Sequence, residues 1–142
     1  MVSSKAITHE QGIEAGCDPK LRENYRSIPD GVVEMDMKGN VVWEWNIFDH
    51  LIQDVDPTKK NYVGKGKTIA DYPQKMDPNF GEGRRGDWIH TNSLNYNETM
   101  DQVVINNSVN SEFYVIDHGG TFIPGNPEKN RYSGSYIYGK CK

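Results

Sequence analysis

The segment from Gly31 to Asn46 constrains the fold more than any other part of the chain. Its two halves, GVVEMDM and VVWEWN, both alternate in side-chain character, and Lys38-Gly39-Asn40 separates them. Period-two alternation is typical of β-strands, and a short Gly-containing connection is typical of a hairpin turn. The sequence therefore predicts a β-hairpin. In the first strand, Val33, Met35 and Met37 are expected to share one face. In the second strand, Val41, Trp43 and Trp45 are expected to share one face.

Further short strands follow at close spacing. We predict strands over Trp88–Tyr96, Gln102–Asn106 and Glu112–Asp117, with turns between them and a fourth apolar run at Thr121–Ile123. The composition agrees, because 11% aromatic residues with 14 Gly and 7 Pro suit a strand-rich chain with many turns. This pattern predicts an antiparallel β-meander.

A short internal sequence similarity indicates repeated β-units. The segment from Val33 to Gly39 resembles the segment from Tyr114 to Gly120, and in both an Asp lies three residues before a Gly at the end of an apolar strand. A propeller blade takes roughly 40 to 45 residues, and even four blades need about 160. The chain has 142 residues. We therefore expect an all-β fold of antiparallel meander blades from an incomplete β-propeller.

The expected organisation has two parts. Residues 1–29 form an irregular lead-in segment, and residues 30–142 hold two to three blade-like units. A helical turn is expected within 47–53. The run 54–86 is a long loop rich in Pro, Gly, Asp and Lys, and it is either functional or a plain surface insertion.

Charge and residue usage exclude several classes of function. With 16 Lys+Arg against 20 Asp+Glu the net charge is −4, which argues against a sequence-independent nucleic-acid binder. The sequence lacks an apolar run of the roughly 18 residues that a membrane span needs. Residues 1–10 lack the apolar core of a signal peptide, so we expect either a cytoplasmic chain or a true N-terminus further upstream. Cys17 and Cys141 make neither a disulfide framework nor a zinc site, and whether they pair stays open. The four histidines lack the spacing of metal ligands, so no metal site is expected.

The densest group of chemically capable residues is Asp87-Trp88-Ile89-His90-Thr91-Asn92-Ser93. In a strand, His90 and Asn92 would share one face with Trp88. An imidazole can exchange a proton near neutral pH and an amide is a fixed donor, so the pair could stabilise an oxyanion. The alternative is that both side chains satisfy loop backbone groups. Asp49-His50 is a weaker carboxylate–imidazole candidate, or else a local cap, and His118 is expected to be an exposed turn residue.

Several of these stretches, in order, resemble bacterial arylsulfate sulfotransferases. They are PDGVVEMD at 29–36, GNVVWEW at 39–45, FDH at 48–50, DWIHTNSLNYN at 87–97, DQVVIN at 101–106 and SEFYVIDH at 111–118. The resemblance implies a β-propeller enzyme that moves a sulfuryl group from an aryl sulfate to a phenol through a transiently sulfated histidine. It implies no cofactor, because no nucleotide sulfate donor is needed.

The family's D-W-x-H-x-N-S motif matches Asp87 to Ser93. The resemblance therefore implies that His90 and Asn92 are catalytic residues that stabilise the sulfuryl oxygens. It further implies that Asp87, Trp88 and His50 bind substrate. Relatives of this family are usually exported, so it also implies a periplasmic or secreted protein.

The chain departs from the family at two places. Asn106-Asn107-Ser108 stands where many relatives carry Ser-Ser-Arg, so the sulfate-binding arginine is absent there. The family's sulfate-accepting histidine lies in a later blade, and no residue of this sequence matches it. The expected function is therefore that of a fragment of a sulfotransferase, and little or no activity is expected of the chain itself, because the accepting histidine is missing. The alternative is a non-catalytic, propeller-derived binding or assembly module that forms homo-oligomers.

Overall fold

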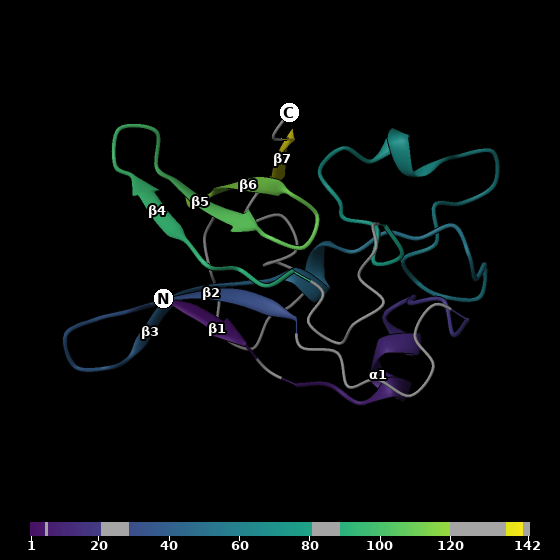
Figure 1. The fold of residues 1–142 in the computed structure, drawn as a ribbon, viewed down its shortest axis with the longest axis horizontal. Helices are drawn as coiled ribbons and strands as arrows, with labels where there is room; N and C mark the ends of the chain where they lie inside the picture. The colour runs from purple at the N-terminus through teal and green to yellow at the C-terminus, as the bar shows by residue number, and fades with distance from the viewer. Residues whose placement is uncertain (5, 21–28, 81–88, 120–135, 141–142) are drawn as a thin grey trace.

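The computed structural model describes residues 1–4, 6–20, 29–80, 89–119 and the backbone of 136–140. The chain is mainly β, with two antiparallel sheets in the orders β1-β2-β3 and β4-β5-β6-β7 (Figure 1). The strands are β1 Val2–Ser4, β2 Asp30–Met35, β3 Val41–Asn46, β4 Leu94–Asn97, β5 Gln102–Asn107, β6 Glu112–Asp117 and β7 Tyr136–Lys140. The helix α1 covers His9–Glu14, and 3₁₀ turns cover Ile47–His50 and Ile69–Asp71.

The predicted hairpin is confirmed as β2 and β3, and its first strand buries the face that carries Val32. Val32 lies opposite Trp45 and is buried with it, whereas Met35 is 44% and Met37 103% exposed. Residues directly opposite in an antiparallel pair share a face, so the two tryptophans decide which side of β2 is buried. The face predicted to carry Val33, Met35 and Met37 is therefore not the buried one.

The second sheet confirms two predicted strands and corrects a third. β5 and β6 lie where the alternation placed them, with Val103 and Ile105 facing Tyr114 and Ile116 in the buried layer. The expected strand Trp88–Tyr96 is wrong over its described first half, because β4 begins only at Leu94. The run Thr121–Ile123 lies outside the described residues, and the backbone of β7 adds a fourth strand that was not predicted.

The core lies between the two sheets. Side chains from β2, β3, β5 and β6 meet there with Ile47, Leu51, Met76 and Ile89 from the connecting segments. Trp45, Ile47, Ile89, Ile105 and Ile116 are at most 1% exposed. Burial of one such side chain stabilises a fold by roughly 1.5–3 kcal/mol, so this layer dominates the contact between the sheets. The described residues do not form a closed ring of blades.

The internal similarity between residues 33–39 and 114–120 has a structural counterpart at the ends of β2 and β6. Asp36 accepts a hydrogen bond from the amide of Lys38 at 2.8 Å, and Asp117 accepts one from Gly119 at 3.1 Å. Aspartate favours turns because its carboxylate can accept an amide two residues on. The repeated Asp therefore accepts an amide two residues on at the end of both strands, while Gly120, the counterpart of Gly39, lies outside the described residues.

The lead-in segment contains a short capped helix. Thr8 and Gln11 form a capping box at the start of α1, and Gly16 ends it with φ +93°. The amides of Gly16 and Cys17 donate to the carbonyls of Ile13 and Gly12, which is the Schellman pattern that uses Gly in the left-handed region.

The long connection after Ile52 is organised by Gln53, whose side chain is fully buried. Its Nε2 donates to the carbonyl of Asp56 at 2.8 Å, and its Oε1 accepts from the amides of Val55 and Asp56. A buried amide that is hydrogen-bonded at both its nitrogen and its oxygen holds the start of the loop against the body of the protein.

Gly31 allows β2 to approach its neighbours closely. A Cβ there would lie 2.9 Å from the carbonyl oxygen of Trp45 and 3.1 Å from Oγ of Ser3. We predict that Gly31→Ala lowers the free energy of unfolding by roughly 1–3 kcal/mol, because backbone on β3 would have to move. Urea denaturation measures the change.

Gly12→Ala is the matched control for this prediction. Its new Cβ would meet only Ile7 at 3.8 Å and Cys17 at 3.9 Å, and alanine is the better helix former by roughly 0.5–1 kcal/mol. Equal effects of the two substitutions would contradict the proposed close approach at Gly31.

Candidate functional site

His90 and Asn92 lie on an irregular segment just before β4. His90 has φ 48°, in the left-handed region, and both side chains are exposed. A residue in that region interrupts the extended backbone, so the alternation of a strand does not apply across it. The prediction that the two residues share a strand face is therefore wrong, and other contacts must orient them.

Asp30 holds this segment from the start of β2. Its side chain is buried, its Oδ2 accepts a hydrogen bond from the amide of Thr91 at 2.6 Å, and its Oδ1 accepts one from Oγ of Ser4 at 2.6 Å. Hydrogen bonds to a carboxylate are stronger than neutral ones. One buried carboxylate thus joins β1, β2 and the segment that carries His90 and Asn92.

Asn106 and Ser108 hold the same segment from the second sheet. Oδ1 of Asn106 accepts from the amides of Asn92 at 3.0 Å and Ser93 at 2.8 Å, and its Nδ2 donates to Oδ1 of Asn92 at 2.6 Å. Oγ of Ser108 donates to the carbonyl of His90 at 2.8 Å. Because Asn106 occupies the oxygen of the Asn92 amide, the end that Asn92 can offer a ligand is its pair of N–H donors.

His50, predicted to bind substrate, lies in a different environment. Its side chain is 3% exposed and its ring stacks on Trp45, with centroids 5.1 Å apart and planes at 18°. Burial, with the positive charge of Lys75 adding to it, lowers the pKa of His50 to about 4. The imidazole is therefore neutral near pH 7, and its role in binding substrate stays a prediction.

The structure places three of the five predicted site residues. Asp87 and Trp88 lie outside the described residues. His90 and Asn92 lie on the same segment, which is hydrogen-bonded to Asp30, Asn106 and Ser108. Ile89, which precedes His90, belongs to the same core cluster as Trp45, on which His50 stacks. His50 is thus linked to the segment through the core.

Sequence reasoning missed the residues that position this segment. Thr91 lies 61 residues after Asp30, and Asn92 lies 14 residues before Asn106. Local sequence patterns do not predict contacts over such separations. Ser108 stood out only as a departure from the family pattern. Asn106 and Ser108 satisfy backbone groups of this segment, and the alternative that His90 and Asn92 also satisfy loop backbone groups stays a prediction.

A second polar cluster surrounds His118, which was expected to be exposed. Its side chain is only 22% exposed, and its ring nitrogens lie 2.8 Å from Asp101 and 2.9 Å from Glu34. The ring centroid lies 4.6 Å from that of Trp43 and 5.5 Å from that of Tyr96. The expectation of a solvated turn residue is therefore wrong, because a strand of the first sheet reaches it.

The described residues contain no group of three or more His, Cys, Asp or Glu side chains arranged to hold a metal ion. Within the same part of the chain, no helix has the length and apolar character to cross a membrane.

An exposed imidazole and an amide whose N–H donors have no hydrogen bond to the described residues, on a segment held from two sheets, form a site suited to an oxyanion. The family of arylsulfotransferases (ASST) matches residues 13–128 of this sequence, which include every residue named above for this site apart from Ser4. The chain therefore belongs to the arylsulfotransferase family, whose enzymes transfer sulfuryl groups and in general use aryl sulfates and phenols. No curated protein matches the chain. Among solved structures, too, there is no match.

The lowered pKa of His50 makes stability depend on pH. The unfolded chain takes up a proton near pH 6.5 and the folded chain near pH 4, so the folded state loses stability as pH falls from about 6.5 to about 4. At 1.36 kcal/mol per pKa unit this loss is roughly 3 kcal/mol. Urea denaturation at a series of pH values should show it in the wild type and not in His50→Gln. Parallel profiles for the two proteins would contradict the assignment.

The contacts of Asp30 predict an effect on the His90 segment. Asp30→Ala leaves the amide of Thr91 without its acceptor and should lower the free energy of unfolding by about 2–3 kcal/mol. Asp30→Asn keeps an oxygen for Thr91 and an amide that can donate to Ser4, so its cost should be smaller. Urea denaturation and hydrogen exchange at the Thr91 amide measure both. Equal exchange rates in the two variants would contradict this role.

Proposed function

We propose that this chain contributes the His90–Asn92 part of the active site of a β-propeller arylsulfotransferase. The reaction moves a sulfuryl group from an aryl sulfate to a phenol. The observation that carries the proposal is the family match over residues 13–128, which contains an exposed imidazole and amide on a segment held by Asp30, Asn106 and Ser108. Neither a cofactor nor a metal takes part in the proposed step.

The proposed chemistry is an exchange of one sulfur–oxygen bond for another through a histidine. The bond between sulfur and the donor aryl oxygen breaks while a bond from sulfur to the accepting histidine forms. The acceptor phenol then displaces the histidine, and its proton replaces the sulfuryl group on the donor phenol. Negative charge shifts over the sulfuryl oxygens and the leaving oxygen during both steps, and fixed donors near them lower the barrier.

His90 and Asn92 take the role of oxygen stabilisers in this scheme. Asn106 holds the oxygen of the Asn92 amide at 2.6 Å, which leaves its N–H donors for a sulfuryl oxygen. The backbone of His90 is held by Ser108 at 2.8 Å, at the position where many relatives carry an arginine. We assign Asp87, Trp88 and His50 to substrate binding in the same proposal, and the periplasm or the extracellular space as the compartment, which cell fractionation tests.

Binding of 4-nitrophenyl sulfate tests the proposal. We expect the wild-type chain to bind it and to release no 4-nitrophenol, because His90 and Asn92 stabilise the sulfuryl group and do not accept it. His90→Gln and Asn92→Asp should each weaken binding by roughly tenfold, the second by placing a carboxylate against an anion. Isothermal titration calorimetry measures binding, and absorbance follows release of 4-nitrophenol.

His9→Gln is the matched control, because His9 lies on α1 and takes no part in the proposed site. Unchanged affinity in all three variants would overturn the proposal. Release of 4-nitrophenol that His90→Gln abolishes would instead make His90 the accepting histidine.

The second candidate is a non-catalytic binding or assembly module that forms homo-oligomers. Its motivation is the exposed apolar surface at strands on the sheet edges, with Val41 and Val42 on β3 45% and 48% exposed and Leu94 on β4 37% exposed. Unpaired strand edges favour association. A chain that binds no 4-nitrophenyl sulfate and yet forms a defined oligomer in light scattering would favour this function.

A further inference from the structure

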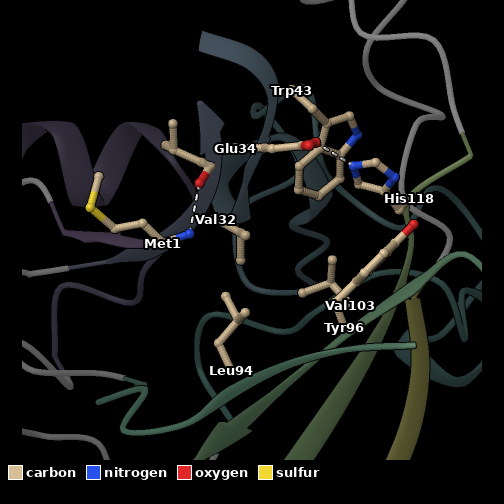
Figure 2. Close-up of a pocket in the computed structure, with 9 residues that line it drawn as sticks. Met1, Val32, Glu34, Trp43, Leu94, Tyr96, Val103 and His118 are labelled. Atoms are coloured by element: carbon tan, nitrogen blue, oxygen red, sulfur yellow. Dashed lines mark hydrogen bonds and ion pairs between the residues drawn. The ribbon is translucent and has the colours of Figure 1, made fainter. Parts of the chain in front are cut away.

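A pocket of about 240 Å³ opens between the two sheets beside His118. Figure 2 shows Glu34 and Trp43 from the first sheet on one side and Leu94 and Val103 from the second sheet opposite them. Val32, Leu94, Val103 and the indole of Trp43 supply an apolar lining. Drug-sized sites begin near 300 Å³, so this pocket suits a smaller molecule with one ring or a short alkyl chain.

The polar side of the pocket is built around His118. The two ring nitrogens of His118 lie 2.9 Å from Glu34 and 2.8 Å from Asp101, so the ring bridges two carboxyl groups. The ring also lies against Trp43 and Tyr96, and aromatic rings attract cations. The residues around His118 thus form a setting for a cation.

Negative charge exceeds positive charge around these rings, because Glu34, Asp101 and Glu98 outnumber the terminal ammonium of Met1, which also lines the pocket and donates to the carbonyl of Val33 at 2.8 Å. The hydrogen bond to Asp101, with desolvation and the charges of Asp101, Glu34 and Glu98 adding to it, raises the pKa of Tyr96. His118 uses one oxygen of Glu34, and the side chain of Glu34 is 52% exposed, so this carboxylate can accept a further donor. The same negative charges repel anionic aryl sulfates. This pocket therefore differs from the His90–Asn92 site in the charge of the ligand that it would bind.

We propose that this pocket binds a small organic cation, an ammonium group attached to an apolar body. The ammonium group donates to the carboxylate of Glu34 at the rim. The apolar body lies between Val32, Leu94 and Val103 and against the indole of Trp43, which adds a cation–π attraction. This site goes beyond the proposed sulfuryl transfer and does not depend on it.

The test compares a cation with a neutral molecule of nearly the same shape. Wild-type protein is titrated with 2-phenylethylammonium and with 2-phenylethanol, and binding is followed by two-dimensional NMR. The indole N–H of Trp43 is a suitable reporter, because this side chain is buried and the N–H has no acceptor among the described residues. We expect the ammonium to bind roughly tenfold more tightly than the alcohol, and added salt to weaken only the ammonium.

Two glutamate variants localise the interaction. Glu34→Gln should reduce the affinity for 2-phenylethylammonium roughly tenfold, to that of the alcohol. Glu44→Gln is the matched control, because Glu44 is exposed on the neighbouring strand β3 and does not line the pocket. His90→Gln should leave binding of the ammonium unchanged, so failure of the sulfotransferase proposal and failure of this one are distinguishable.

Several results would overturn the proposal. They are equal affinities for the ammonium and the alcohol, full affinity in Glu34→Gln, equal losses in Glu34→Gln and Glu44→Gln, or chemical-shift changes that fall on Thr91 to Ser93 instead of the pocket. Should Glu34→Gln fail to fold, the comparison of the two ligands and the salt dependence in the wild type still decide the outcome.

Discussion

The packing of the two sheets against each other is the interaction on which the rest of the structure depends. Trp45 of the first sheet and Ile105 and Ile116 of the second are almost fully buried in this layer. Because apolar burial is strong but has no direction, it brings the sheets together without specifying the polar contacts at their edges. Those contacts come from individual side chains that only the packed structure brings within reach.

Strand β2 shows how one element serves two sites. Asp30 at its start accepts the amide of Thr91 and so holds the segment that carries His90 and Asn92. Glu34 near its other end reaches His118 and borders the pocket between the sheets. Both acidic residues act across the same interface, one as a buried acceptor for backbone and the other as a half-exposed partner for a ring. The two proposed sites are therefore separated by the length of a strand.

Ser108, where the resemblance implies an arginine in many relatives, has a structural role here. It donates to the carbonyl of His90 at 2.8 Å. Together with Asn106 it supports the segment that carries His90 and Asn92. In the proposed function, this chain stabilises a sulfuryl group through neutral hydrogen-bond donors. Stabilisation by such donors depends more strongly on their distance and direction than stabilisation by a full charge does.

The sequence by itself determined the hairpin of β2 and β3, the strands β5 and β6 and membership of the family, because alternation and turn residues act over a few neighbouring positions. It also singled out His90 and Asn92 as residues capable of the chemistry. Only the tertiary structure decided that Val32 and not Val33 faces the core, that His90 leaves the strand conformation, and that His118 is half-buried. These outcomes depend on packing between elements, such as the burial of Val32 with Trp45 against the second sheet and the contact of Glu34 with His118 84 residues along the chain, and local patterns carry no information about such packing.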